Sequence, residues 1–180
     1  MEIIALAKRL VSGLKERRFS GNYKYESDLE EEVYSIFRKI IKAELHLKGD
    51  KKLNDIIITH GKEEPEKERW TATKGWQDVI IAGCRNTSDI VIKLPGRPID
   101  QDSPKHCNTI AVQLKYAKNR ITGAIQTIVG QCLIASLRHS TVIGIVLSKK
   151  KIEAHEKERI TNLADRLEKY HKVFLIVRDI

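Results

Sequence analysis

The chain has 180 residues, with 33 lysines and arginines against 24 aspartates and glutamates, and a formal net charge of +9 at pH 7. This length fits one domain with a sizeable core. The positive charge favours a polyanionic partner, of which nucleic acid is the simplest. The alternative is that the excess charge only keeps the protein soluble. No apolar run is long enough to span a membrane, and the three cysteines form no zinc or disulfide pattern. We therefore expect a cytoplasmic protein with reduced cysteines and no membrane partner.

The N-terminal segment is amphipathic, with lysines and arginines inside it, and does not resemble a signal peptide. Apolar residues recur at helical spacing over Glu2–Leu14, which predicts a helix. A basic turn follows and includes Arg17 and Arg18. This turn is either a solvated connection or an arm that contacts the backbone of a nucleic acid.

Tyr25–Leu47 is the clearest helix, because Leu, Val and Ile recur along one stripe and acidic residues crowd its first turn, where the helix dipole favours them. At about 100° per residue, Glu26 projects toward the middle of this stripe and Glu30 toward its edge. A carboxylate on the buried side of a helix needs a partner. Glu26 therefore needs such a partner, unless these acids are ordinary helix-start charges.

Two short strands are expected to carry the chemistry. Thr87–Ile92 and Ile110–Lys118 are β-branched and apolar, with polar residues at alternate positions. Side chains alternate between the faces of a strand, so Gln113 and Lys115 share one face. Paired in suitable register, the two strands bring Asp89, Gln113 and Lys115 to one polar spot. An acid, an amide oxygen and an ammonium group suit a divalent metal and a phosphate.

This pattern resembles the PD-(D/E)XK nuclease superfamily, whose signature is an acid near one strand and then acid-x-Lys on the next. Here Asp89 is followed by Gln113-Leu114-Lys115, so glutamine replaces the second acid. Some branches of the superfamily carry Gln-x-Lys there, including methyl-directed restriction enzymes. The resemblance covers roughly residues 25–148.

The resemblance implies a magnesium-dependent nuclease that cuts DNA, with Mn²⁺ able to substitute for Mg²⁺. It implies that Asp89, the Gln113 amide and the Leu114 carbonyl hold the metal. The pattern Glu26-x-x-Leu29 is similar to the family's motif for an acid that faces the metal from the first helix, so Glu26 is the first choice for that acid and Glu30 the second. Lys115 would position the attacking water and stabilise charge. Two further expectations complete the site: Gln131 approaches it from the following helix, and the candidate DNA contacts are Lys118, Arg120, Arg17 and Arg18.

The order of elements predicts an α/β fold with a mixed sheet flanked by helices, which agrees with the restriction-endonuclease-like core of that superfamily. We expect a hairpin between strands 77–82 and 88–94, a short strand near 55–59, and Asp78 as a weaker rival of Asp89. The single domain divides into an N-terminal helix and basic turn (1–22), a core (25–148), and a C-terminal helix and strand (149–180).

Two other functions stay open. The chain could be a nuclease-fold protein that binds nucleic acid without cutting it, with Gln113 as the sign of a decayed site. It could also be a scaffold whose basic face meets an acidic protein. A homodimer is a further expectation, because two-fold symmetry suits the two antiparallel strands of a duplex. The helices at Glu2–Leu14 and Ile152–Tyr170 are the candidate interface.

Overall fold

The computed structural model describes residues 3–21, 23–48, 57–60, 78–81, 84–94 and 106–180. Within these ranges none of the helices combines the length and the apolar character needed to cross a membrane. The helices are α1 (Ile3–Glu16), α2 (Glu26–Lys48), α4 (Ile121–Ser136) and α5 (Ala154–His171). The strands are β1 (Ile57–His60), β2 (Asp78–Ile81), β3 (Cys84–Thr87), β4 (Ile90–Lys93), β5 (His106–Ala117), β6 (His139–Ser148) and β7 (Val173–Asp179).

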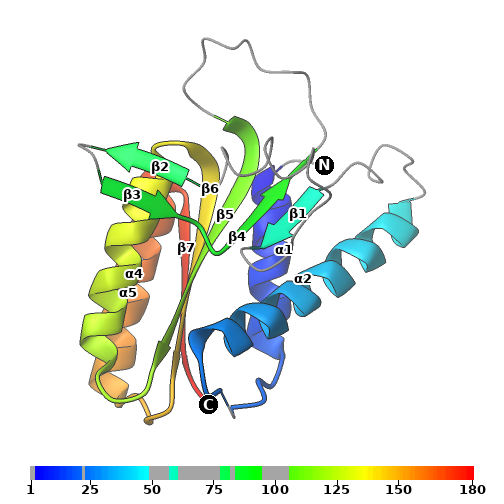
Figure 1. Cartoon of the computed structure of the whole chain (residues 1–180). Helices are drawn as coiled ribbons and strands as arrows, with labels where there is room; N and C mark the ends of the chain where they lie inside the picture. The colour runs from blue at the N-terminus through cyan, green and yellow to red at the C-terminus, as the bar shows by residue number, and fades with distance from the viewer. Residues whose placement is uncertain (1–2, 22, 49–56, 61–77, 82–83, 95–105) are drawn as a thin grey trace.

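Five strands form one mixed sheet in the order β1-β4-β5-β6-β7. The β1–β4 and β4–β5 pairs are antiparallel, whereas β5–β6 and β6–β7 are parallel. Parallel neighbours require a crossover connection, and α4 and α5 supply the two crossovers (Figure 1). The chain is therefore an α/β protein with a mixed sheet, as the sequence predicts.

Helices cover both faces of this sheet, giving three layers (Figure 1). On one face the apolar stripe of α1, which includes Leu6, Leu10 and Leu14, is fully buried with residues of α2 and with Ile143 and Ile145 of β6. Burial of such side chains contributes about 1.5–3 kcal/mol each. The first two helices are thus fixed to the sheet.

On the opposite face, α4 approaches the sheet closely over Gly144. A Cβ atom at Gly144 would lie 2.8 Å from the Sγ atom of Cys132 and 2.8 Å from a methyl carbon of Ile128. Only glycine leaves room for these two side chains. Because Gly144 is the neighbour of Gln113 in the parallel ladder, this contact also sets the height of α4 above the motif strand.

The predicted hairpin between residues 77–82 and 88–94 is wrong. The strand β2 pairs instead with β3, in a separate two-stranded sheet, and β4 pairs with β1. The segment Cys84–Thr87 is the partner strand, although most of it would form the turn of the predicted hairpin (83–86). The composition of a short apolar strand does not predict which strand it pairs with. Pairing depends on which face each strand buries in the complete sheet.

The expected interface helices also need correction. The stripe of α1 is buried within the chain itself, so a second copy cannot use it. The helix α5 begins at Ala154, after a capping box between Glu153 and Glu156, and Lys149–Lys151 therefore lie in the loop before it. The structure places Asp78 in the separate two-stranded sheet, and its side chain lies outside the described residues.

Candidate active site

The strand β5 extends beyond its partner β4, which leaves one edge of β5 free of strand pairing after Val112. Two carboxylates accept hydrogen bonds from backbone N–H groups along this free edge. The last backbone bond of that pairing runs from the N–H of Asp89 to the carbonyl of Val112, over 3.0 Å. Two residues on, the N–H of Leu114 donates to the carboxylate of Asp89 over 2.7 Å. The N–H of Tyr116 then donates to the carboxylate of Glu26 over 3.3 Å. Side chains from distant parts of the chain thus continue the ladder and stand side by side along one strand edge.

The carbonyl of Leu114 belongs to the same edge. In a strand the N–H and C=O groups of one residue point to the same side, and the N–H of Leu114 points at Asp89. The backbone oxygen that the resemblance implies as a metal ligand therefore lies on the edge that carries both carboxylates.

Lys115 meets Glu26 at this edge. Its ammonium nitrogen lies 3.1 Å from one carboxylate oxygen of Glu26 and 3.0 Å from the other. Both side chains are about one-third exposed, at 37% and 34%. Solvent screens such a pair, so it contributes about 0–1 kcal/mol to stability. Its main consequence is positional, since it holds a cation beside the carboxylates.

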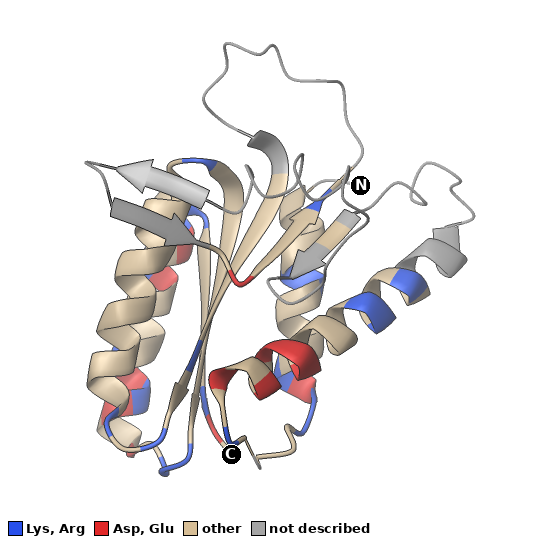
Figure 2. Ribbon diagram, in the orientation of Figure 1, with Lys and Arg blue, Asp and Glu red and all other residues tan. Residues whose placement is uncertain are grey.

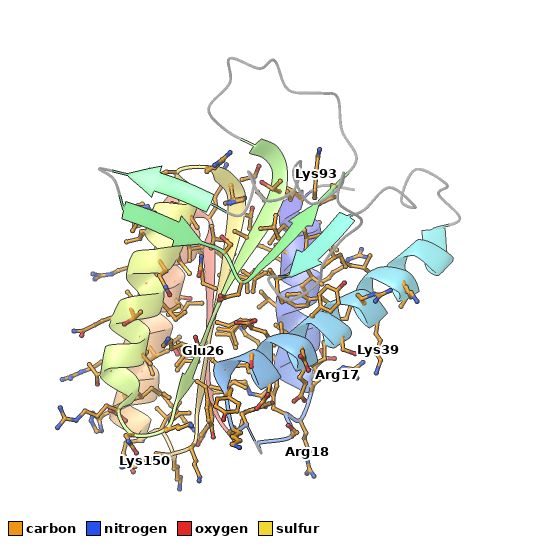
Figure 3. All side chains as sticks on the ribbon, viewed as in Figure 1. Arg17, Arg18, Glu26, Lys39, Lys93 and Lys150 are labelled. Atoms are coloured by element: carbon orange, nitrogen blue, oxygen red, sulfur yellow. The ribbon has the colours of Figure 1, made fainter. Side chains whose placement is uncertain are left out.

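The local sequence fixes the place of Glu26 at the start of α2. The carboxylate of Asp28 accepts hydrogen bonds from the N–H groups of Tyr25 (2.8 Å) and Lys24 (2.9 Å). These bonds fix the backbone just before the first turn of α2. Glu32 accepts from the hydroxyl of Tyr23 over 2.7 Å, and burial together with this bond raises the pKa of Tyr23 to about 12. The loop before the helix is therefore held, and Glu26 is presented to β5. Its label in Figure 3 marks this position beside the sheet.

Asp89 lies in an unfavourable setting for an ionised acid. Burial, together with the nearby charges of Glu30 and Glu26, raises the pKa of Asp89 to about 7. The hydrogen bond from Leu114 and the charge of Lys115 act in the opposite direction. Two acids of α2 are therefore close enough to Asp89 to repel it, and excess negative charge collects at this edge.

Glu30, the second choice from the sequence, acts on Asp89 more strongly than Glu26 does. The two residues are four apart on α2, so they share one face of the helix. Glu26 contacts the strand and the lysine, and Glu30 adds negative charge beside Asp89. The helical spacing indicates that both residues lie near the site. It does not predict which of them contacts Lys115 and which lies beside Asp89.

Gln113 is buried next to the edge. Its side chain is 1% exposed, and its amide nitrogen donates to the hydroxyl of Ser88 over 3.2 Å. Ser88 is fully buried and precedes Asp89 in the chain. A neutral amide can be satisfied there by a hydroxyl, whereas a second carboxylate would place another charge in a desolvated position. The contact with Ser88 was not anticipated from the sequence.

The expected faces of the motif strands are confirmed. Val112, Leu114 and Tyr116 pack with the α1–α2 side, whereas Ala111 and Ala117 pack with the α4–α5 side. Gln113 and Lys115 leave the strand on the latter side. There the thiol of Cys132 has its pKa raised by burial and by the charge of Asp89. Gln131, half-buried on α4, precedes Cys132, and its role in the site stays a prediction.

Basic residues from three loops gather at the end of the molecule where β5 finishes. The ammonium group of Lys118 donates to the carbonyl of Lys24 over 2.9 Å, and the N–H of Lys149 donates to the carbonyl of Ala117 over 3.0 Å. Figure 2 shows the basic colour of these loops, and Figure 3 places Arg17, Arg18 and Lys150 at this end, with Lys93 at the other. We call the group the basic rim: Arg17, Arg18, Lys24, Lys118, Arg120 and Lys149–Lys151.

The members of the basic rim are exposed. Arg120 directly precedes α4 without capping it through its side chain. The guanidinium group of Arg178 ties the loop after α1 in place by donating to the carbonyls of Leu14, Lys15 and Arg17, over 2.8–3.0 Å. The sequence shows the lysine run 149–151, but its adjacency to Lys118 arises from the β5–β6 pairing.

The chemistry of the edge fits a hard divalent cation. Among the residues that the structure describes, no three His, Cys, Asp or Glu side chains surround one point. The carboxylates of Asp89 and Glu26 instead accept from N–H groups and from Lys115. Carboxylate and carbonyl oxygens are nevertheless the ligands that Mg²⁺ prefers. The pKa of Asp89 is raised mainly by burial and in part by the charges of Glu30 and Glu26, and a bound cation would offset both effects.

Comparison with protein-family models, with curated proteins and with solved structures found no match for this chain. The resemblance to the nuclease superfamily therefore depends on the motif residues and on their arrangement at the edge of β5.

Proposed function

We propose that this protein is a magnesium-dependent nuclease that hydrolyses phosphodiester bonds in DNA. The observation that carries the proposal is the meeting of Asp89, Glu26 and Lys115 along the free edge of β5, although they are far apart in the sequence. Two acids and a lysine fixed to one strand edge match the order of the motif. The three-layer α/β arrangement is compatible with a restriction-endonuclease-like core, which we include in the proposal.

Asp89, Glu26 and the Leu114 carbonyl would hold the cation, and the Gln113 amide is the remaining candidate ligand. When bound, Mg²⁺ would polarise a phosphoryl oxygen and lower the pKa of a water molecule. Lys115 would hold the attacking water and stabilise the negative charge that develops on the phosphate. For this Lys115 must share or leave the Glu26 carboxylate, which a screened and partly exposed pair permits.

In the reaction the oxygen of water forms a bond to phosphorus, and the bond from phosphorus to one bridging oxygen breaks. The leaving oxygen takes up a proton and becomes a hydroxyl group, while the attacking water gives up a proton. The chain needs no other reactant, because hydrolysis consumes only water.

The basic rim supports DNA as the substrate. Its members lie at the end of the molecule where Lys115 and Glu26 meet, and a polyanionic backbone is attracted there by charge. Phosphate contacts of this kind position a nucleic acid without reading its sequence. The rim therefore supports binding of DNA but indicates no base preference.

A second candidate is a protein that binds nucleic acid without cutting it. The observation that favours it is the glutamine in place of the second acid, buried against Ser88. A site with one carboxylate fewer binds a divalent cation more weakly. A scaffold with an acidic protein partner stays a third candidate, and binding to DNA with a steep salt dependence would count against it.

One assay separates these candidates. Purified protein is incubated with Mg²⁺ or Mn²⁺ and with linear, circular, single-stranded and branched DNA, and binding is measured on the same substrates. The nuclease proposal expects cleavage of at least one substrate that chelation of the metal abolishes. Salt-sensitive binding with no cleavage of any substrate would favour the second candidate, and the absence of both would favour the scaffold.

A further inference from the structure

An exposed tyrosine directly precedes one of the two carboxylates of the proposed site. The side chain of Tyr25 is 60% exposed, and the next residue is Glu26, whose carboxylate contacts Lys115. Consecutive Cα atoms are about 3.8 Å apart, so the two side chains leave the backbone at neighbouring points. An aromatic ring left in water forgoes the stabilisation that burial would give it. The ring of Tyr25 is therefore available to a molecule bound at the site.

The loop that carries Tyr25 is fixed by side chains at both ends. After α1, the guanidinium group of Arg178 donates to three backbone carbonyls of residues 14–17. Before α2, the carboxylate of Glu32 accepts a backbone N–H of the loop, and that of Asp28 accepts the N–H of Tyr25 over 2.8 Å. A ring on a fixed backbone loses little conformational freedom when a ligand covers it. Tyr25 is thus a pre-organised contact.

The ring of Tyr25 also lies among the cations of the basic rim. The ammonium group of Lys24 is 5.3 Å from the centre of this ring, and the carbonyl of Lys24 accepts from the ammonium group of Lys118 over 2.9 Å. By contrast, Tyr23 of the same loop is 7% exposed and packs edge-on against the ring of Tyr116. Cations attract phosphates and an exposed ring stacks on a base, which is the combination that binds single-stranded nucleic acid.

We infer that Tyr25 stacks on an unpaired base, and that the substrate is DNA that is single-stranded where it enters the site. In a duplex the bases are stacked on one another inside the helix, so a ring at its side reaches no base face. Every base has such a face, so this contact adds no sequence preference, in agreement with a rim that contacts phosphates. The inference rests on the proposed function, because it takes DNA as the substrate.

A second tyrosine of the chain provides a matched control. Tyr170 is 67% exposed, and the ammonium group of Lys169 lies 5.1 Å from the centre of its ring. This pair is near the C-terminal end of α5, whereas residues 149–151 of the basic rim precede the start of that helix. The two tyrosines therefore share exposure and a lysine neighbour, but only Tyr25 adjoins the proposed site.

Binding to single-stranded and duplex DNA of equal length tests the inference. Fluorescence anisotropy with a metal chelator present measures the affinities of the wild type, Tyr25→Ala, Tyr25→Phe and Tyr170→Ala. Loss of one stacked base weakens binding by about 5- to 100-fold. We expect a loss of that size for Tyr25→Ala on single strands, with its duplex affinity nearly unchanged. Tyr25→Phe keeps the ring, so it should bind single strands as the wild type does, and so should Tyr170→Ala.

Two further readouts distinguish stacking from a structural effect. Tyr25→Ala should leave the salt dependence of binding unchanged, because no charge is lost, and it should fold, because the ring is exposed and the bond to Asp28 is made by the backbone. In the wild type, a fluorescent adenine analogue whose emission falls on stacking should be quenched when a thymine-flanked single strand that contains it binds. Tyr25→Ala should abolish this quenching.

The outcomes separate this inference from the proposed function. If the wild type cleaves no DNA but Tyr25→Ala selectively loses affinity for single strands, the nuclease proposal fails and the inference holds. If the wild type cleaves DNA and Tyr25→Ala binds single strands as tightly as the wild type, the inference fails and the nuclease proposal stands. An equal loss on single strands and duplex, or a Tyr25→Phe variant as weak as Tyr25→Ala, would also overturn the inference.

Discussion

The ammonium group of Lys115 lies 3.0 and 3.1 Å from the two carboxylate oxygens of Glu26, although the two residues are 89 positions apart. The contact joins the start of α2 to the end of the motif strand, where Glu26 also accepts the N–H of Tyr116. It brings the acid predicted from the helix to the lysine predicted from the strand.

Replacing Glu26 by glutamine should weaken cation binding while leaving the fold intact. The amide oxygen can still accept from Tyr116, but one negative charge is lost from the edge. Because the Lys115–Glu26 pair is screened, we expect the free energy of unfolding to change by less than about 1 kcal/mol. Calorimetric titration with Mg²⁺ measures the affinity, and Glu31→Gln, at an exposed position of α2, is the matched control. Equal loss of affinity in both variants would remove Glu26 from the metal site.

Asp89→Asn should stabilise the metal-free protein at neutral and higher pH. The pKa of Asp89 is raised by burial from 3.8 to about 7 in the folded chain, so between these values the folded state binds the proton that the unfolded state has lost. The free energy of unfolding therefore falls as pH rises through this window and levels off above it. The shift sets a ceiling of about 4 kcal/mol, and partial solvation reduces the expected gain at pH 8 to about 1–3 kcal/mol.

Denaturant unfolding of wild type and Asp89→Asn at pH 4.5 and pH 8, with a metal chelator present, measures this difference. Asparagine can still accept the N–H of Leu114, so the hydrogen bond is preserved. A stability difference that is the same at both pH values would show that Asp89 titrates normally. The variant should also lose cleavage of DNA, because the proposed metal site would lose a charged ligand.

Gln113→Glu should destabilise the metal-free chain and tighten its binding of Mg²⁺. The new carboxylate would be buried against Ser88, close to Asp89, and an unpaired buried charge costs about 1–3 kcal/mol or more. With a cation present the added charge becomes favourable, and cleavage should be retained or increased. Thermal unfolding with and without Mg²⁺ reports both effects, with Asn162→Glu as an exposed control. If Mg²⁺ protects the variant no more than the wild type, Gln113 does not face the metal.

Removing charge from the basic rim should weaken DNA binding without changing the fold. For the double variant Lys118→Ala, Arg120→Ala we expect lower affinity on every DNA sequence and a slope of log affinity against log salt that is shallower by about 2. Lys169→Ala, at the other end of α5, is the control. Fluorescence anisotropy at several salt concentrations measures the slope, and an unchanged slope would place the DNA elsewhere.

The faces that the site residues occupy on β5 could be predicted from the sequence, because the alternation of polar and apolar residues along a strand is a local property. The pattern of Ile110–Lys118 assigns Gln113 and Lys115 to one face, and the structure confirms this through the packing of Leu114 and Tyr116 on the other. Helical periodicity likewise predicts that Glu26 points toward the buried stripe. In the structure its carboxylate accepts a hydrogen bond from the N–H of Tyr116 in β5.

Partners in space could not be predicted in the same way. The segments Ile57–His60 and Asp78–Ile81 are both short and apolar, and only the complete sheet decides that the first pairs with β4. The bond between Gln113 and Ser88, and the place of Lys149–Lys151 beside Lys118, likewise depend on strand register. Register is set by the burial of whole faces rather than by any single residue.

The most direct test of the central claim is single-turnover cleavage of DNA by the wild type and by Lys115→Met, measured with Mg²⁺ on a substrate that the wild type cuts. Methionine keeps most of the apolar stem of the side chain and removes the ammonium group, with its charge and its N–H donors. Loss of one group that stabilises the transition state typically costs about 10²- to 10³-fold in rate. We expect a loss of that size, with DNA binding changed far less. Equal cleavage rates for the two proteins, or no metal-dependent cleavage by the wild type on any substrate, would contradict the assignment of this edge as a nuclease site.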